Sequence, residues 1–173
     1  MSPHDLPDLE ERLSRPTPAV IDLMRQIPGD FIVLGAAGKM GPSLAGMIKR
    51  ASDDAGTPRR VIAVSRFSSP GSQEEFNAHG IETVARDLLD ANAVAYLPAA
   101  ANVIYMAGMK FGATGNESLT WAMNAWLPGI VCERYSRSRI VAFSTGNVYG
   151  LTPVENGGSR EEDTLHPAGE YAM

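Results

Sequence analysis

Three glycines are spaced three residues apart in the run Gly-Ala-Ala-Gly-Lys-Met-Gly, which lies directly before a helical pattern. A pyrophosphate is bound by backbone N–H donors at a helix N-terminus, and glycines let the chain turn tightly and approach the anion without a Cβ in the way. The alternative is that the glycines only permit a tight turn between a strand and a helix. The run predicts a dinucleotide-binding turn formed by Gly35, Ala37, Gly38, Lys39, Met40 and Gly41.

The end of the next apolar run, at Ser65 and Arg66, indicates which dinucleotide would bind. A ribose without a 2′-phosphate is commonly gripped by an acidic side chain about twenty residues after the glycines, and this strand ends without an acid. A guanidinium can instead make a two-pronged contact with phosphate, and Lys39 adds positive charge. These residues favour NADP(H) without excluding NAD. The alternative is that Arg66 is an ordinary solvated side chain.

Two further predicted strands end in residues that suit the rest of a dinucleotide. Asp87 and Leu88 follow one strand, where a side chain can reach the adenine edge, although Asp87 can also cap a helix that begins at Leu88. The other strand ends in mostly small residues, which allow a ribose and a nicotinamide to pass closely or simply let a neighbouring helix pack. These residues are Met106, Ala107 and Gly108.

Strands and helices must alternate along the chain to position these residues. Apolar runs predict strands at 31–34, 61–64, 81–84, 102–107 and 139–143. Helical spacing predicts helices after Met40 and at 72–79, 88–95 and 117–135, the last kinked or shortened by Pro128 and Gly129. Parallel strands need crossovers, and strands that are apolar on both sides need helices on both sides. The sequence therefore predicts an α/β fold, a Rossmann-like doubly wound parallel sheet with helices on both faces.

The chain is expected to consist of two regions, a polar N-terminal arm and a single domain. Residues 1–29 are expected to form a polar surface arm with a short helix at 19–26, which Pro28 and Gly29 end. Residues 30–173 are expected to form one NAD(P)-binding Rossmann domain, partial because no substrate-binding part follows, with an exposed loop at 151–169.

Composition and charge argue against several classes of protein. The chain of 173 residues has 20 acidic and 15 basic residues and no basic run, so nothing favours nucleic-acid binding. Its single cysteine excludes an internal disulfide, and its three histidines are too far apart for a recognisable metal site. The charge-free segment 91–109 contains Asn92, Pro98 and Asn102, and predicts a helix end, a turn and a buried strand rather than a membrane span. Because the N-terminus has no secretory signal, a cytoplasmic location follows by elimination.

The motifs together resemble those of one family, the extended short-chain dehydrogenase/reductases, or NAD(P)-dependent epimerase/dehydratase family. The resemblance runs from residue 31 to the last residue and adds two features, Asn124 and the run Phe143-Ser-Thr-Gly-Asn-Val-Tyr-Gly150. It implies that Thr145, or its neighbour Ser144, holds a substrate oxygen. It also implies that Tyr171 donates or accepts the proton of a substrate hydroxyl while hydride passes to or from the nicotinamide. The alternatives are that Thr145 is a turn hydroxyl and that Tyr171 is an amphipathic aromatic residue near a chain end.

The chain departs from this family in three ways. The Lys of the family's Y-x-x-x-K motif would fall at position 175, beyond the last residue, and the family's smaller substrate domain is absent. The chain is therefore expected to be a fragment that binds cofactor with little turnover. Gly146 and Asn147 replace the acidic pair of the family's dehydratases, which leaves epimerisation, or oxidation and reduction, of a sugar-like substrate such as a nucleotide sugar.

The resemblance also implies a partner, a second copy bound through the helix at 117–135. A different class of function stays open beside the enzyme, namely a non-catalytic NAD(P)-binding module that senses redox state.

Overall fold

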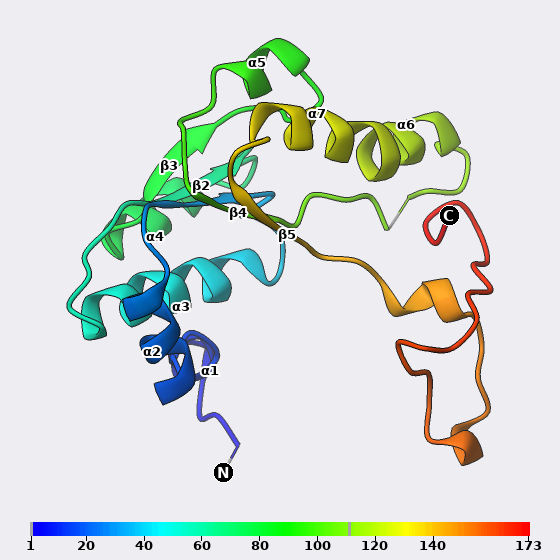
Figure 1. Ribbon diagram of the computed structural model, residues 1–173, viewed down its shortest axis with the longest axis horizontal. Coiled ribbons are helices and arrows are strands. Elements are labelled where there is room, and N and C mark those ends of the chain that lie inside the picture. Colours follow the sequence, from blue (N-terminus) through cyan, green and yellow to red (C-terminus); the bar gives the residue numbers. More distant parts are fainter. Residues whose placement is uncertain (1, 111) are drawn as a thin grey trace.

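A five-stranded parallel sheet forms the centre of the protein in the computed structural model, which describes residues 2–110 and 112–173 (Figure 1). The strands are β1 (Phe31–Leu34), β2 (Val61–Ser65), β3 (Glu82–Ala85), β4 (Asn102–Tyr105) and β5 (Arg139–Ala142). Their order is β3-β2-β1-β4-β5, so the chain reverses direction across the sheet between β1 and β4. This arrangement is the doubly wound, Rossmann-like fold that the sequence predicts.

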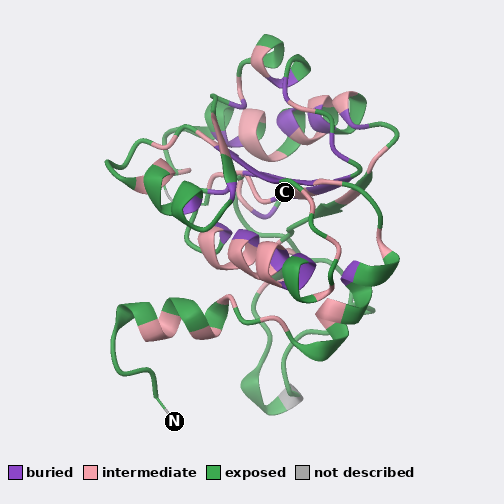
Figure 2. Ribbon diagram, turned by 90° about the vertical axis from the view of Figure 1, so that its left-hand side faces the viewer, coloured by how far each residue is buried: buried purple, intermediate pink, exposed green. Residues whose placement is uncertain are grey.

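The helices form two layers, one on each side of the sheet (Figure 2). Ile32 and Leu34 of β1 share a core with residues of α5 and α7, whereas Phe31 and Val33 share a second core with residues of α2, α3 and α4. The helical elements are α1 (Leu6–Leu13), α2 (Pro18–Gln26), α3 (Gly41–Asp54), α4 (Ser72–Ala78), α5 (Ala91–Ala95), α6 (Glu117–Trp121), the π-helical turn η1 (Ala122–Trp126), α7 (Leu127–Arg134) and the short 3₁₀ turns η2 (Gly146–Tyr149) and η3 (Val154–Asn156).

Strands β1, β2 and β4 end in register, and the candidate site lies at the edge of the sheet that their carboxyl ends form. Leu34 of β1 is in register with Val64 of β2 and with Tyr105 of β4. The turns that follow these three strands therefore begin side by side, which is where ligands bind in open α/β sheets.

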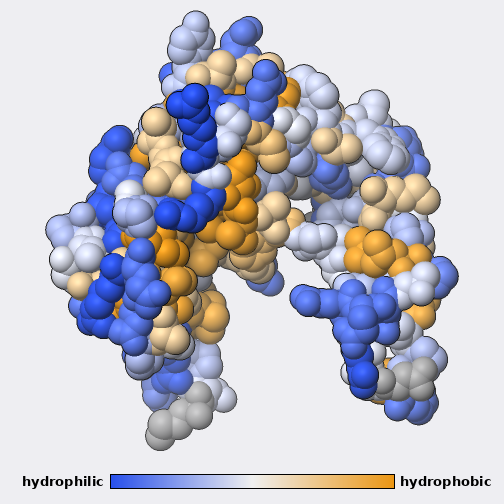
Figure 3. All heavy atoms as spheres, in the orientation of Figure 1, coloured by the Kyte–Doolittle hydropathy of each residue, from blue (hydrophilic) through white to orange (hydrophobic). Residues whose placement is uncertain are grey.

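The two faces of the sheet are not covered equally. Helices pack on both sides of β1 and β2, but Val141 of β5 is 56% exposed and Phe143 just beyond it is 45% exposed. Figure 3 shows hydrophobic side chains on the main body beside an open gap that separates it from the C-terminal segment. The prediction of helices on both faces therefore applies to the centre of the sheet and not to its β5 edge.

The N-terminal arm is docked on the domain more firmly than a surface appendage would be. Met24 of α2 is buried in the core against α3, and the Arg59 guanidinium donates hydrogen bonds to the carbonyl oxygens of Met24 and Ile27 at 2.7 and 2.6 Å. These bonds satisfy carbonyls at the C-terminal end of α2 that lack helical partners. The first helix, α1, was not predicted, and none of its residues is buried. It is attached to α3 by a hydrogen bond that the Arg50 guanidinium donates to the Glu11 carboxylate.

The charge-free segment 91–109 contains a short helix, a turn and a buried strand, as predicted. Helix α5 begins at Ala91 rather than at Leu88, because Asp90 accepts hydrogen bonds from the backbone N–H groups of Asn92 and Ala93 and so caps it. Within the described ranges no helix is long and apolar enough to cross a bilayer.

Two buried tyrosines predict how the stability depends on alkaline pH. The hydroxyl of Tyr105 donates to the carbonyl of Met123 at 3.1 Å, and that of Tyr135 donates to the carbonyl of Pro98 at 2.9 Å. Burial raises the pKa of Tyr105 and the pKa of Tyr135 to about 12. An unfolded tyrosine titrates near pH 10, so the folded state binds these protons more tightly. The stabilisation is complete below about pH 10 and is lost as the pH rises toward 12.

We expect Tyr135→Phe to reduce this alkaline loss of stability by about 1 to 2 kcal/mol between pH 8 and pH 11.5. Urea unfolding of the wild type and the variant at pH 8 and at pH 11.5 measures the difference. An equal loss in both proteins would contradict the prediction.

Candidate functional site

A cavity of about 530 Å³ opens at the carboxyl ends of β1, β2 and β4. The turn after β1, the segments after β2, β3 and β4, and the helix that begins with α6 all contribute to its lining. Most of the predicted cofactor-binding residues lie in it, namely Gly35, Ala37, Gly38, Ser65, Arg66, Asp87, Leu88, Met106, Ala107 and Gly108. Lys39, Met40 and Gly41 belong to the same turn but do not line the cavity.

The three positions of the turn require glycine to different degrees. Gly35 has a positive φ of 88°, and a Cβ there would lie 2.7 Å from the Ala107 amide nitrogen. A Cβ on Gly41 would lie 1.9 Å from the carbonyl oxygen of Ala36. Both glycines are therefore required by the fold, as the simple-turn alternative supposes. Gly38 differs, because a Cβ there would meet only the Gly35 carbonyl oxygen, at 3.3 Å, and the residue lines the cavity.

Unpaired backbone donors surround Gly38. The amides of Gly38 and Gly41 donate to the carbonyls of Gly35 and Gly38, closing the turn. Within residues 2–110 and 112–173, the amides of Ala37, Lys39 and Met40 have no protein acceptor, and no side chain caps the start of α3. A 14-residue helix carries partial positive charge at this end. The turn can therefore accept an anionic group such as a pyrophosphate, and it fits a dinucleotide.

The loop after β2 supplies polar lining that the sequence analysis missed. Arg66 is exposed at the cavity, and hydroxyl side chains follow it at Ser68, Ser69 and Ser72. Phe67 between them has a positive φ of 48° and packs edge-on against Phe76, with ring centres 5.7 Å apart. A left-handed phenylalanine is uncommon, and its packing against α4 keeps the loop in this conformation. The Ser-Pro-Gly turn signal was visible in the sequence, but its position beside the cavity was not.

Asp87 organises the segment after β3. Its carboxylate accepts a hydrogen bond from the Leu89 amide at 3.0 Å. Because α5 begins only at Ala91, Asp87 is not the helix cap considered as its alternative role. It lines the cavity in a local turn beside Leu88.

The opposite end of the cavity is apolar. Met109, Leu119 and Met123, none of them predicted, line it together with residues 106–108. Asn124 holds this loop, because its Oδ1 accepts from the Met109 amide at 2.8 Å and its Nδ2 donates to the Met109 carbonyl at 3.1 Å.

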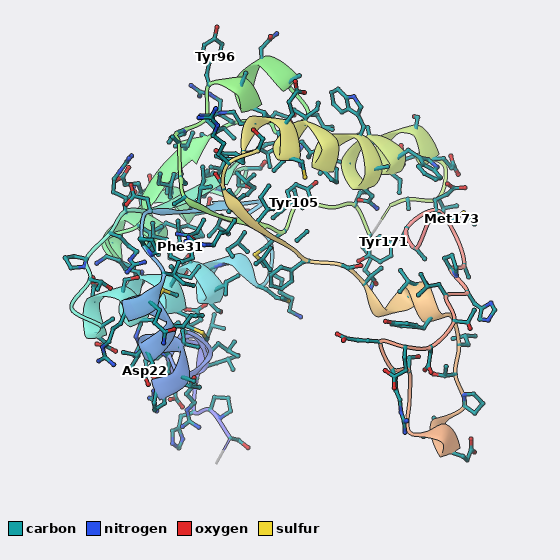
Figure 4. The ribbon with its side chains drawn as sticks, in the orientation of Figure 1. Asp22, Phe31, Tyr96, Tyr105, Tyr171 and Met173 are labelled. Carbon is teal, nitrogen blue, oxygen red and sulfur yellow. The ribbon has the colours of Figure 1, made fainter. Side chains whose placement is uncertain are left out.

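The two residues that the family resemblance implies as catalytic lie outside the lining of this cavity. Thr145 caps η2, and its Oγ1 accepts a hydrogen bond from the Asn147 amide at 3.2 Å. Tyr171 extends from the C-terminal segment toward the loop after β4, where Lys110 Nζ lies 5.7 Å from its ring centre (Figure 4). In the part of the chain that the structure describes, no hydrogen bond joins Thr145 to Tyr171.

The C-terminal segment is nevertheless attached near the site. Glu170 accepts a hydrogen bond from Trp121 Nε1 at 2.5 Å, which joins the segment to α6. The amide of His166 donates to the carbonyl of Val148 at 2.8 Å, which joins it to η2. Among the described residues, no cluster of His, Cys, Asp and Glu side chains could hold a metal ion.

The strand order and the cavity at its reversal point define this chain as a Rossmann-like domain, and solved structures share this fold. MoeE5, in complex with UDP-glucose and NAD, superposes with a TM-score of 0.65 at 22% identity, over 83% of this chain and 44% of that one. ADP-L-glycero-D-manno-heptose-6-epimerase from Helicobacter pylori gives 0.67 at 17% identity, over 86% and 48%. UDP-glucuronic acid 4-epimerase from Bacillus cereus, in complex with NAD, gives 0.61 at 17% identity, over 83% and 48%.

These identities are low, so the likeness establishes the fold and not an activity. The chain spans less than half of the length of each of these three proteins. No family model matches the sequence, and no curated protein matches it.

Proposed function

We propose that the chain is the NAD(P)-binding part of an epimerase or oxidoreductase that acts on a hydroxyl or keto group of a sugar-like substrate. The observation that carries this proposal is the turn around Gly38. This turn contains backbone donors without protein acceptors in the described chain, and its residues Gly35, Ala37 and Gly38 line a cavity at the reversal point of the sheet. The solved structures with the same fold support it, since two of them are in complex with NAD and one of these also holds UDP-glucose.

Each part of the cavity has a role in this proposal. The amides of Ala37, Lys39 and Met40 hold the pyrophosphate, since they are unpaired in the described chain. Asp87 and Leu88 border the adenine, and residues 106–108 border the ribose and nicotinamide. The nicotinamide, when bound, supplies the acceptor or donor of hydride. The apolar side chains of Met109 and Met123 exclude water from that end of the cavity.

Thr145 and Tyr171 handle the proton of the substrate in this proposal. The Thr145 oxygen already accepts from Asn147, so its own hydrogen is left to donate to a substrate oxygen. As the substrate carbon gives up hydride to the oxidised nicotinamide, the proton of its hydroxyl would pass to Tyr171 acting as the phenolate, which becomes a neutral phenol. The reverse reaction would return the hydride and the proton to the keto group. Lys110 places positive charge beside this ring. Because neither hydroxyl lines the cavity, we expect this chain by itself to show little turnover.

Titration with NADH, NADPH and ATP tests the cofactor assignment. Nicotinamide fluorescence should rise on addition of the folded chain, and ATP should compete only weakly, because it lacks the second ribose and the nicotinamide. A folded chain that binds ATP but neither NADH nor NADPH would refute the proposal.

The second candidate function, a non-catalytic dinucleotide-binding module, is favoured by the position of Thr145 and Tyr171 outside the cavity lining. Mass-spectrometric detection of hydrogen isotope exchange between a carbon-deuterated UDP-sugar and NAD+ separates the two. Exchange that Tyr171→Phe abolishes supports the enzyme, whereas tight cofactor binding without any exchange supports the module.

Arg66 is proposed to favour NADP(H), because its guanidinium and the hydroxyls of Ser68, Ser69 and Ser72 form the polar end of the cavity. We expect Arg66→Ala to weaken NADPH binding about 10- to 100-fold, the loss of a charge-assisted contact, and NADH binding less than about 3-fold. Fluorescence titration measures both constants. Arg86→Ala is the control, since Arg86 is exposed nearby and does not line the cavity. Equal losses for the two cofactors would remove the argument for NADP(H).

We also propose a cytoplasmic homodimer that is formed through α6, η1 and α7. Trp121 and Trp126 on this helix are 44% and 50% exposed, which supports a protein contact there. The free, exposed Cys132 suits a reducing compartment.

A further inference from the structure

Helices α6 and α7 are joined by the π-helical turn η1, and the sequence around η1 gives the physical cause of this turn. In η1 the Leu127 amide donates to the carbonyl of Ala122, five residues back, rather than to that of Met123. Pro128 follows directly. Proline has no N–H, and its ring clashes with the carbonyl four residues before it, which belongs to Asn124. A widened π-turn relieves this clash without breaking the helix.

The widened turn deprives the Met123 carbonyl of the donor that Leu127 would supply in a regular α-helix, and the sheet supplies a replacement. The carbonyl of Met123 receives no bond from Leu127, which uses Ala122, and none from Pro128, which has no N–H. The Tyr105 hydroxyl at the end of β4 donates to it at 3.1 Å. Figure 4 shows Tyr105 beneath this helix. The turn is thus joined to the strand that leads into the cavity.

The residue after Met123 completes the connection. Both polar atoms of the Asn124 side chain bind the backbone of Met109, at 2.8 and 3.1 Å. A Cβ on Gly108 would lie 3.4 Å from Asn124 Oδ1, so the loop passes in contact with this side chain. These two hydrogen bonds hold the loop that lines one end of the cavity, formed by Met106, Ala107, Gly108 and Met109.

We propose that Pro128 and Asn124 are positioning residues for the cofactor. Pro128 sets the π-turn, the π-turn directs Asn124 at Met109, and Asn124 fixes loop 106–109 in the form that receives the nicotinamide. This inference rests on the proposed function, because it assigns that end of the cavity to the nicotinamide. It adds that a proline outside the cavity lining controls the shape of the site.

The experiment compares Pro128→Ala and Asn124→Ala with Gly129→Ala. Gly129 is the matched control, because it lies in the same helix and a Cβ there meets nothing within 4 Å. Alanine suits a helix at all three positions, so each variant is expected to fold. The readouts are the NADH dissociation constant and the rate of hydrogen exchange at the Met109 amide in the cofactor-free chain, followed by NMR.

We expect Asn124→Ala and Pro128→Ala to weaken NADH about 10-fold and to speed exchange at the Met109 amide about 10-fold, the effect of losing one or two net hydrogen bonds. Gly129→Ala should leave both unchanged. Unchanged exchange and affinity in Asn124→Ala would overturn the role of Asn124, and the same result in Pro128→Ala would overturn that of Pro128. A wild-type chain that binds no NADH refutes the proposed function instead, while the exchange rates still test whether Pro128 sets the clamp on Met109.

Discussion

Gly38→Asp is expected to abolish the binding of both NADH and NADPH while the fold persists. A Cβ at this position would meet only the Gly35 carbonyl oxygen, a tight contact at 3.3 Å that a shift of a few tenths of an ångström relieves. Gly38 lines the cavity, so we expect the substitution to place its carboxylate there rather than in the core. The pyrophosphate would then meet a negative charge where the unpaired amides of Ala37, Lys39 and Met40 receive it. We expect affinity to fall about 100-fold or more, since like charges at close range cost several kcal/mol.

Fluorescence titration with both cofactors measures this loss, and circular dichroism verifies the fold. Gly129→Asp makes the same chemical change in an exposed helix position outside the cavity, and should bind as the wild type does. If Gly38→Asp retained wild-type affinity, the pyrophosphate would not lie at this turn.

Gly41→Ala is expected to lower the stability of the fold, in contrast to Gly38→Asp, which is expected to lower the affinity for the cofactor. Its Cβ would lie 1.9 Å from the carbonyl oxygen of Ala36, a buried backbone group that cannot rotate away. Relief requires the start of α3 to move away from the turn after β1, which disrupts the second core, where Ala36, Ala45 and Ile48 pack. We expect a loss of about 3 kcal/mol or more in the free energy of unfolding.

Urea unfolding measures this loss, with Gly129→Ala as the control at an open position. Reduced cofactor affinity is expected only to the extent that the variant is unfolded. A Gly41→Ala protein of wild-type stability would show that the turn can rearrange freely, which contradicts the packing described for it.

Much of the fold could be predicted from residue pattern. The apolar runs at β1 and β2 predicted strands buried on both faces, and the glycine turn predicted the start of α3. The residues after β2, β3 and β4 were predicted as one site because parallel strands end at the same edge of the sheet. The cavity contains most of them, since the ends of these strands lie in register, Leu34 with Val64 and with Tyr105.

Other features depended on contacts between distant segments. The sequence showed Pro128 but not that the helix would accommodate it through a π-turn whose carbonyl pairs with Tyr105, because that bond joins residues 18 apart. Helix α1 was missed because its amphipathic pattern buries none of its own residues. The serines after Arg66 were visible, but the left-handed Phe67 that turns them toward the cavity depends on packing against Phe76.

The glycine motif shows most directly what each level determined. From residue types and spacing alone, the sequence determined that a strand, a tight turn and a helix follow one another, because glycine is the residue that such a turn accepts. Only the tertiary structure decided that Gly35 is confined by Ala107 of the neighbouring segment, whereas Gly41 and Gly38 face carbonyl oxygens of their own turn, those of Ala36 and Gly35. The reason is physical. Backbone preference is local and can be read along the chain, whereas the space around an atom is set by whichever segments pack there.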